Sequence, residues 1–270
     1  MADFETVLYE EEKGVAWVTL NRPEAYNAFN TKMRDELYSI WQSLRTNEEV
    51  RCVVVTGAGD RAFCTGIDRQ EAIEEDYLQR EQSAYASTWD FVDIAGKVAP
   101  KTSGLWKPVI AAVNGIACAG AFYILGEVEF IIAADHATFF DPHVTYGMTA
   151  AFEPTYMLQK MPFSEIMRMS LLGAYERVTA ERAYQVGLVS QVVPAAELRD
   201  AAAWAAGVIA DQHPIPIGGT VRALWAAREL SRQQALDLCY LYTHLGTRKE
   251  VLREGQDKFA SGARVEWRKR

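Results

Sequence analysis

Residues 114–124, NGIACAGAFYI, directly follow the apolar run PVIAAV at 108–113. The stretch is built almost entirely from small residues until Phe122 and Tyr123. Small side chains at the junction of a strand and a helix allow another molecule to come close to the backbone. The stretch therefore predicts a buried strand that ends in a turn with an accessible backbone, followed by a helix.

Other short apolar runs predict the rest of a sheet. CVVVTG at 52–57 and FIIAA at 130–134 are solidly apolar, as expected of strands covered on both faces. The polar stretch over roughly 70–100 has a mostly helical pattern. From residue 163 onward helical patterns dominate, with one short strand at 192–194. This order predicts an α/β core at 1–195 and an α-helical region at 196–270.

The N-terminal part of the chain predicts a hairpin and then a helix. FETVLYE and GVAWVTL flank the turn Glu10–Gly14. Apolar residues then recur at helical spacing after Thr31, which is a candidate N-cap.

Composition limits the classes of partner. The 270 residues carry a formal net charge of −8, which disfavours nucleic acid and anionic membranes as partners. The four cysteines lie far apart without metal-ligand spacing, which indicates reduced thiols and no metal site. There is no apolar run long enough to span a membrane, and the acidic N-terminus does not resemble a signal peptide. We therefore expect a cytoplasmic protein.

A second glycine-marked turn, AFCTGID at 62–68, follows the strand at 52–57. Each of the two turns can present a free backbone N–H group. Two such donors that converge on one point form an oxyanion hole, which stabilises the enolate of a thioester. Either turn alone would be weak evidence, because glycine often follows a strand.

Four segments, read in order, strengthen this interpretation. They are LNRPEAYNAF (20–29), VVVTGAGDRAFCTGID (53–68), KPVIAAVNGIACAGA (107–121) and AYQVGLVSQVVP (183–194). Over residues 5–267 the chain resembles the crotonase superfamily, the enoyl-CoA hydratase/isomerase family. The resemblance implies a spiral of ββα units and a helical C-terminal region that forms homotrimers, often dimers of trimers. It also implies an acyl-CoA thioester as substrate, with coenzyme A entering as part of that substrate and no separate cofactor.

The resemblance also assigns candidate binding residues. The oxyanion donors would be the backbone N–H groups of Ile67 and Gly120. Phe259 matches an aromatic residue that closes over adenine, often from a neighbouring subunit. The nucleotide and pantetheine path would run along Ala25, Tyr26, Ala28, Thr65 and Asp68. The basic C-terminal residues Arg264, Arg268, Lys269 and Arg270 either bind the coenzyme A phosphates or form a charged tail.

The chain departs from the family pattern at both catalytic glutamates. Hydratases of the family carry one glutamate three residues after the oxyanion glycine and another twenty residues further on. Here these positions hold Tyr123 and His143. Tyrosine is a poor base at neutral pH but can donate a hydrogen bond or fill the pocket. Histidine titrates near neutrality, so His143 is a candidate base or substrate-polarising group, with a structural histidine as the alternative. Asp141 is a candidate to orient the imidazole, although Pro142 lies between the two residues.

Glu153 is a further candidate for the acid–base chemistry. Pro154 disfavours helix at Glu153, so we expect this residue in a loop just before a helix. Other branches of the family place a catalytic acid at about this position. A solvated carboxylate without a catalytic role is the alternative.

Taken together, these residues predict an acyl-CoA-processing enzyme that works through a thioester enolate. The missing glutamates disfavour simple hydration, whereas double-bond isomerisation needs only one proton shuttle. Carbon–carbon hydrolysis or decarboxylation of a keto-acyl-CoA or a related diketone is an alternative. A coenzyme A-binding relative without catalytic activity is another.

Overall fold

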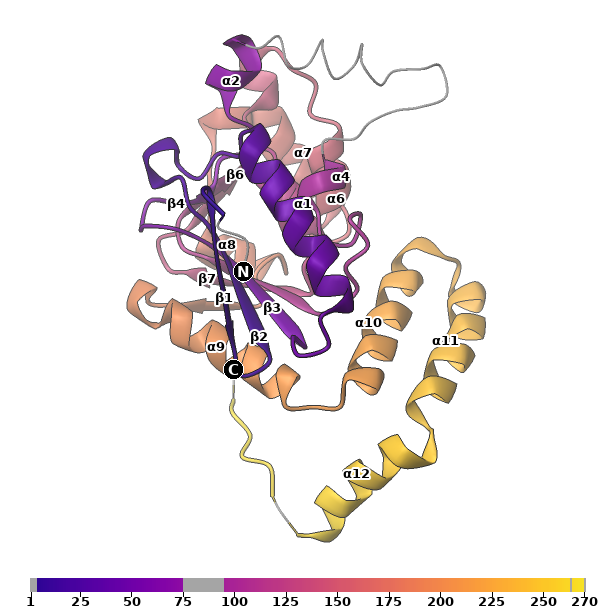
Figure 1. The fold of residues 1–270 in the computed structure, drawn as a ribbon. Helices are drawn as coiled ribbons and strands as arrows, with labels where there is room; N and C mark the ends of the chain where they lie inside the picture. The colour runs from indigo at the N-terminus through magenta and orange to yellow at the C-terminus, as the bar shows by residue number, and fades with distance from the viewer. Residues whose placement is uncertain (1–3, 75–94, 263, 270) are drawn as a thin grey trace.

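The computed structural model describes residues 4–74, 95–262 and 264–269. Its larger sheet has six strands in the order β1-β2-β3-β5-β7-β10 (Figure 1). β1 pairs antiparallel with β2, and the remaining pairs are parallel. The strands are β1 (Val7–Glu12), β2 (Val15–Leu20), β3 (Cys52–Gly57), β5 (Val109–Val113), β7 (Phe130–Ala134) and β10 (Gln191–Val193). The predicted hairpin and the predicted apolar strands are confirmed.

A smaller sheet of four strands has the order β4-β6-β8-β9. Its strands are β4 (Ala62–Cys64), β6 (Ile116–Cys118), β8 (Thr138–Phe140) and β9 (Val178–Thr179). The chain alternates between the two sheets and then enters a helix, as in β3-β4-α2 (Arg69–Glu74) and β5-β6-α5 (Ala121–Glu127). This repeated unit confirms the predicted α/β fold built from ββα units.

Both faces of the larger sheet are buried, because side chains alternate along each strand. Val53 and Val55 belong to one apolar cluster with residues of α1 (Thr31–Thr46) and the smaller sheet. Cys52 and Val54 face the other side, where they belong to a second cluster with α9 (Leu198–Ala210). The solid apolar runs of the sequence follow from this arrangement.

The helix α1 begins one residue earlier than the sequence suggested. Asn30 is its N-cap, and the side-chain oxygen of Asn30 accepts a hydrogen bond from the Met33 amide at 2.9 Å. Thr31 is the first helical residue, and its own amide donates to Glu71. The prediction of Thr31 as the cap was wrong, because asparagine and threonine both suit that position and the sequence presents them side by side.

The remaining helices surround or extend the core. They are α4 (Ala95–Val98), α6 (Phe152–Met157), α7 (Phe163–Leu172), α8 (Ala180–Gln185), α10 (Pro214–Glu229), α11 (Arg232–Gly246) and α12 (Lys249–Ala260), with short 3-10 turns η1 (Pro23–Ala25), η2 (His143–Tyr146), η3 (Gly173–Tyr175) and η4 (Ala195–Glu197). Helix α9 packs on the larger sheet, whereas α10, α11 and α12 extend away from it (Figure 1).

The stretch over 70–100 that the sequence predicts as helical lies mostly outside the described residues, and only α2 and α4 at its ends are described. Within the described residues, no helix has the length and apolar character needed to cross a membrane.

Candidate active site

The two glycine-marked turns meet in space. The amide of Phe29 donates to the Gly66 carbonyl at 2.8 Å, and the amide of Asp68 donates back to the Phe29 carbonyl at 3.1 Å. This bridge fixes the turn after β4 beside Phe29, whose ring lies against Gly120 in the turn after β6. Gly66 has a left-handed backbone, with φ of +85°, and a Cβ atom added there would lie 2.7 Å from the Gly120 nitrogen. The two turns are therefore in direct contact.

The amides of Ile67 and Gly120 lie at the wall of one cavity. Both residues line a hollow of about 240 Å³. Among the described residues, neither amide donates a hydrogen bond to another protein group. A buried amide needs an acceptor, so a ligand oxygen in this cavity would complete the hydrogen bonding of these two groups.

His143 faces the same cavity and is held between two carboxylates. Asp141 follows β8, His143 begins η2, and Glu153 belongs to α6. Nδ1 of His143 donates to Oδ1 of Asp141, since an ionised carboxylate can only accept. The backbone amide of His143 donates to the same oxygen at 3.1 Å. On the other side, Nε2 of His143 lies 3.5 Å from Oε1 of Glu153.

Burial makes these contacts strong. Asp141 is fully buried, and the side chains of His143 and Glu153 are 16% and 6% exposed. Burial by itself would lower the pKa of His143. The hydrogen bond to Asp141 and the charges of Glu153 and Asp141 outweigh that effect and raise the pKa above its ordinary value. The three side chains are linked through the imidazole, which is the member of the group that can take up and release a proton.

Glu153 lies in the first turn of a helix and not in a loop before it. α6 begins at Phe152, and Glu153 is buried within it. The expectation of a loop was wrong because Pro154 also falls in the first turn, where a missing N–H group leaves no hydrogen bond unmade. The helix start fixes the backbone of Glu153 and directs its carboxylate toward His143.

Tyr123 does not line this cavity. Its side chain is buried in α5 and contacts Tyr156 of α6 edge to face, with ring centroids 5.5 Å apart. The ring therefore sets the packing of α5 against α6, and α6 in turn carries Glu153.

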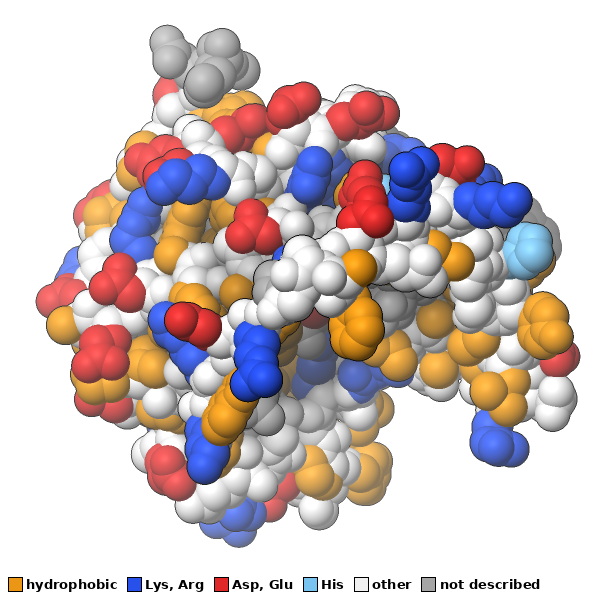
Figure 2. Space-filling view, turned by 90° about the horizontal axis from the view of Figure 1, so that it is seen from below, with side chains coloured by type: hydrophobic (Ala, Val, Ile, Leu, Met, Phe, Trp, Pro, Cys, Tyr) orange, Lys and Arg blue, Asp and Glu red, His pale blue; other side chains and the backbone are white. Residues whose placement is uncertain are grey.

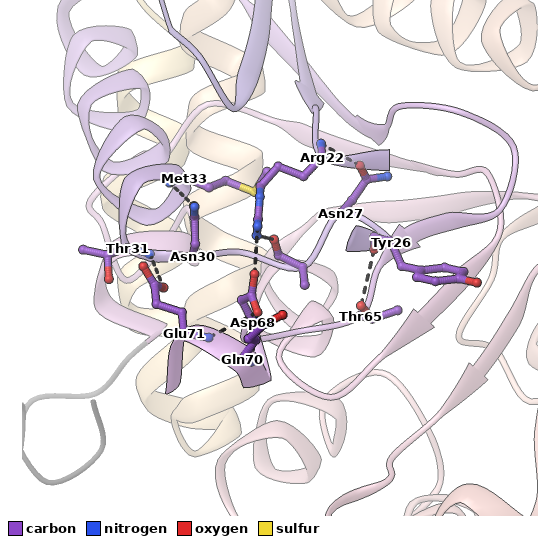
Figure 3. A network of polar contacts seen from close by, with 11 residues as sticks. Arg22, Tyr26, Asn27, Asn30, Thr31, Met33, Thr65, Asp68, Gln70 and Glu71 are labelled. Atoms are coloured by element: carbon purple, nitrogen blue, oxygen red, sulfur yellow. Dashed lines mark hydrogen bonds and ion pairs between the residues drawn. The ribbon is translucent and has the colours of Figure 1, made fainter. Parts of the chain in front are cut away.

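The residues predicted to hold the nucleotide and pantetheine are mostly gathered in one place (Figure 3). Arg22 connects them, because its guanidinium donates to the Ala28 carbonyl at 2.7 Å and pairs with Asp68 at 2.8 Å. The Thr65 hydroxyl donates to the Tyr26 carbonyl at 3.4 Å, directly after Ala25 at the end of η1. Burial alone would raise the pKa of Asp68, but the contacts with Arg22 and nearby amides lower it.

Phe259 is the exception among the predicted binding residues. It lies at the end of α12 and is 88% exposed, at the opposite end of the molecule from β4, β6 and α2 (Figure 1). Within one chain the structure does not bring Phe259 to the cavity.

Five residues that line the cavity were not among the predicted site residues, and two of them, Ala119 and Pro142, are direct neighbours of predicted ones. Arg69, Tyr146 and Met148 all line the cavity, and the Arg69 guanidinium lies 4.5 Å from the centre of the Tyr146 ring. Spacing carried a signal for two of them. Arg69 follows Ile67 by two residues. Tyr146 follows His143 by three residues in a 3-10 turn, and residues at that spacing lie on the same face of the turn. Among the described residues, no group of three or more acidic, histidine or cysteine side chains is arranged to hold a metal ion.

Comparisons with known proteins agree with the fold. The sequence profile of the enoyl-CoA hydratase/isomerase family matches residues 10–270. The chain is 33% identical to (E)-benzylidenesuccinyl-CoA hydratase of Thauera aromatica, over 93% of this chain and 92% of that protein. It is 32% identical to 1,2-epoxyphenylacetyl-CoA isomerase of Escherichia coli K12, over 94% and 95%.

A solved structure gives the same result. The crystal structure of an enoyl-CoA hydratase/isomerase from Mycobacterium paratuberculosis superimposes with a TM-score of 0.86 at 32% identity, covering 98% of each chain. The chain belongs to the enoyl-CoA hydratase/isomerase family, within the crotonase superfamily.

Proposed function

We propose that the chain binds an acyl-CoA thioester with its carbonyl oxygen between the amides of Ile67 and Gly120. Proton loss from the carbon next to that carbonyl forms an enolate, and the two amides stabilise the negative charge that develops on the oxygen. The proposal is supported by the contact between the two turns. It is also supported by the backbone N–H groups of Ile67 and Gly120, which donate to no described protein group and belong to residues that line one cavity.

The proton is moved by the pair His143 and Glu153. The single observation that carries this assignment is that both side chains line the cavity of the two amides and lie 3.5 Å from each other. Asp141 positions the imidazole and fixes its tautomer, so that Nε2 faces Glu153 and the cavity. A pair that takes a proton from one carbon and returns it to another performs double-bond isomerisation of an enoyl-CoA.

A carbon–carbon hydrolase acting on a keto-acyl thioester is the second candidate. It is favoured by the hydrogen bond between the buried Asp141 and His143, since an imidazole oriented by a carboxylate also activates water for attack on a carbonyl. Simple hydration of crotonyl-CoA is disfavoured, because the two usual glutamate positions hold Tyr123 and His143 and Tyr123 is turned away from the cavity.

The test begins with exchange of substrate protons. A saturated acyl-CoA is incubated with the protein in deuterated water, and loss of the proton next to the carbonyl is followed by NMR. We expect His143→Ala and Glu153→Gln each to slow exchange by ~10²–10⁴-fold. The double variant should be little slower than the slower single variant, as for residues that act as one unit.

The matched control is His136→Ala. His136 is an exposed histidine whose ring contacts the Asp60 carbonyl outside the cavity, so exchange should be unchanged. Tight binding of acyl-CoA without any exchange would show a non-catalytic coenzyme A-binding protein instead. Failure of every acyl-CoA to raise the Tm would reject the thioester site altogether.

A further inference from the structure

Arg69 places a positive charge at the cavity. It lines the same hollow as His143 and Glu153 and follows Ile67 by two positions in the chain. Its guanidinium stacks on the ring of Tyr146 at 4.5 Å. Stacking of this kind holds the planar group in one orientation and leaves its N–H edge available.

The carboxylates near Arg69 in the sequence are engaged elsewhere. Asp68 pairs with Arg22 at 2.8 Å and also accepts the amide of Gln70 at 3.0 Å. Glu71 accepts the amide of Thr31 at 2.8 Å. Figure 3 shows both side chains directed toward Arg22 and the start of α1. Among the described residues, Arg69 has no ion-pair partner.

Glu153 is the acidic residue among those that line the cavity, and its Oε1 lies 3.5 Å from Nε2 of His143. Asp141 does not line the cavity and accepts from Nδ1 of the same imidazole. Among the described residues that line the cavity, Arg69 therefore carries a cationic group without a carboxylate partner. Arginine binds carboxylates through two parallel N–H groups, which gives both strength and direction.

The size of the cavity limits the acyl group. Its volume of about 240 Å³ lies below the roughly 300–1,000 Å³ typical of pockets for drug-sized ligands. Ala119, Pro142 and Met148 line the same cavity as Gly120 and Arg69 and give it part of an apolar wall. A short acyl chain that ends in a charged group fits a small cavity with apolar residues and one arginine in its wall.

We infer that the acyl group of the substrate is short and ends in a carboxylate, which Arg69 binds while the thioester carbonyl occupies the two amides. This inference rests on the proposed function, because it takes the Ile67 and Gly120 amides as the carbonyl site. The substrate class is the coenzyme A monothioester of a short dicarboxylic acid.

The test compares two ligands that differ only in charge. Glutaryl-CoA ends in a carboxylate, and its amide analogue, 5-amino-5-oxopentanoyl-CoA, has the same shape without the charge. We expect calorimetry to show that the wild-type chain binds the acid about tenfold more tightly than the amide, the size expected of one charge-assisted hydrogen-bonded pair. In Arg69→Gln the preference should vanish while affinity for the amide stays unchanged, and Arg69→Glu should prefer the amide.

Arg199→Gln is the matched control. Arg199 also stacks on an aromatic ring, at 4.3 Å from the centre of Trp17, but lies outside the cavity. This variant should keep the preference for the acid. Arg69 is exposed, so its variants should keep the wild-type Tm, which is measured alongside.

The outcomes separate the two proposals. Equal binding of acid and amide by the wild type would overturn the inference about the acyl group and leave the thioester site standing. An equal loss of both ligands in Arg69→Gln would also overturn it, because Arg69 would then bind the coenzyme A phosphates. If neither ligand binds the wild type, the proposed function itself fails, and this inference fails with it.

Discussion

The imidazole of His143 owes its chemistry to two carboxylates from different elements. Asp141 precedes it across one proline, and Glu153 reaches it from α6. One carboxylate fixes the ring orientation, and the other is the group that we propose shares the proton. An isolated histidine at this position would have neither property, and burial alone would favour its neutral form.

The first prediction is that Asp141→Asn lowers the pKa of His143. Burial, which lowers this pKa, would then be opposed mainly by Glu153. NMR titration of the imidazole protons measures the change directly. Asp135→Asn, an exposed aspartate outside the cavity, is the control and should leave the His143 titration in place. An unchanged pKa in Asp141→Asn would contradict the assignment of Asp141 as the positioning residue.

The same shift predicts how stability depends on pH. The folded state raises the pKa of His143 above its ordinary value of about 6.5, so folding binds the proton more tightly. The stabilisation from this group is fully present below about pH 6.5 and is lost as the pH rises through the folded-state pKa. The free energies of unfolding of wild type and His143→Gln, measured in urea, should therefore differ most at low pH. A difference that grows with pH would contradict the raised pKa.

At the residue scale the sequence pointed to His143 and Glu153, which the structure brings within 3.5 Å of each other, but it did not predict their contacts. Register with the family gave both residues, and Pro154 gave the incorrect expectation that Glu153 lies in a loop. The sequence could not predict that Tyr123 turns into the packing between α5 and α6, because a tyrosine suits a pocket or a core equally well. Arg69 was missed because its role depends on Tyr146, which lies 77 positions later in the chain.

At the scale of elements, the paired turns depend on glycine at position 66. The left-handed backbone and the approach to Gly120 are separate reasons for this requirement. The strands of the larger sheet were predicted well, since solid apolar runs such as 52–57 and 130–134 have few alternatives in a sheet covered on both faces. The strands β4 and β6, which lead directly into the turns, were not predicted, because strands of three residues are too short to show a pattern of their own. The starts of α1 and α6 were predicted less well. Asn30 and Thr31 are both suitable N-cap residues for α1, and Pro154 is tolerated at more than one position of the first turn of α6.

Gly66→Ala should be markedly destabilising and should weaken acyl-CoA binding. The new Cβ atom would meet the Gly120 nitrogen at 2.7 Å, in addition to the cost of about 1–2 kcal/mol for a left-handed alanine. Gly187→Ala is the matched control, because Gly187 has φ of +88° and nothing within 4 Å of the added atom. Urea unfolding should show a larger loss in the free energy of unfolding for Gly66→Ala than for Gly187→Ala. Equal losses would mean that the two turns do not support each other.

At the scale of the molecule, α10, α11 and α12 expose more apolar surface than a lone chain would be expected to leave in water. The exposed side chains on these helices include Leu224, Leu236, Tyr240, Leu241, Leu245 and Leu252. Figure 2, which views the molecule from below, shows apolar side chains gathered on the side where Figure 1 places α11. A patch of this kind marks an interface. We propose that these helices hold a homotrimer or a dimer of trimers.

The corresponding prediction is that Leu241→Glu dissociates the assembly. Leu241 is 65% exposed in the single chain, and a charge buried in an interface without a partner is strongly unfavourable. Sedimentation velocity should show a smaller species than for wild type. Leu8→Glu, an exposed leucine on β1, should leave the assembly intact. A wild-type chain that sediments as a monomer would reject the proposed assembly.

The contact between Gly66 and Gly120 also limits how this chain can recombine with its relatives. A segment 62–68 from another parent that carries any residue other than glycine at position 66 would place its Cβ atom 2.7 Å from the Gly120 nitrogen, which is too close. Segment 114–121 is under the reciprocal constraint, because a side chain at Gly120 would strike Phe29 at 2.6 Å. In a library of chimaeras, the two segments should therefore survive selection for folding only as a pair from one parent. Shuffling at crossover points between them would yield mostly insoluble products.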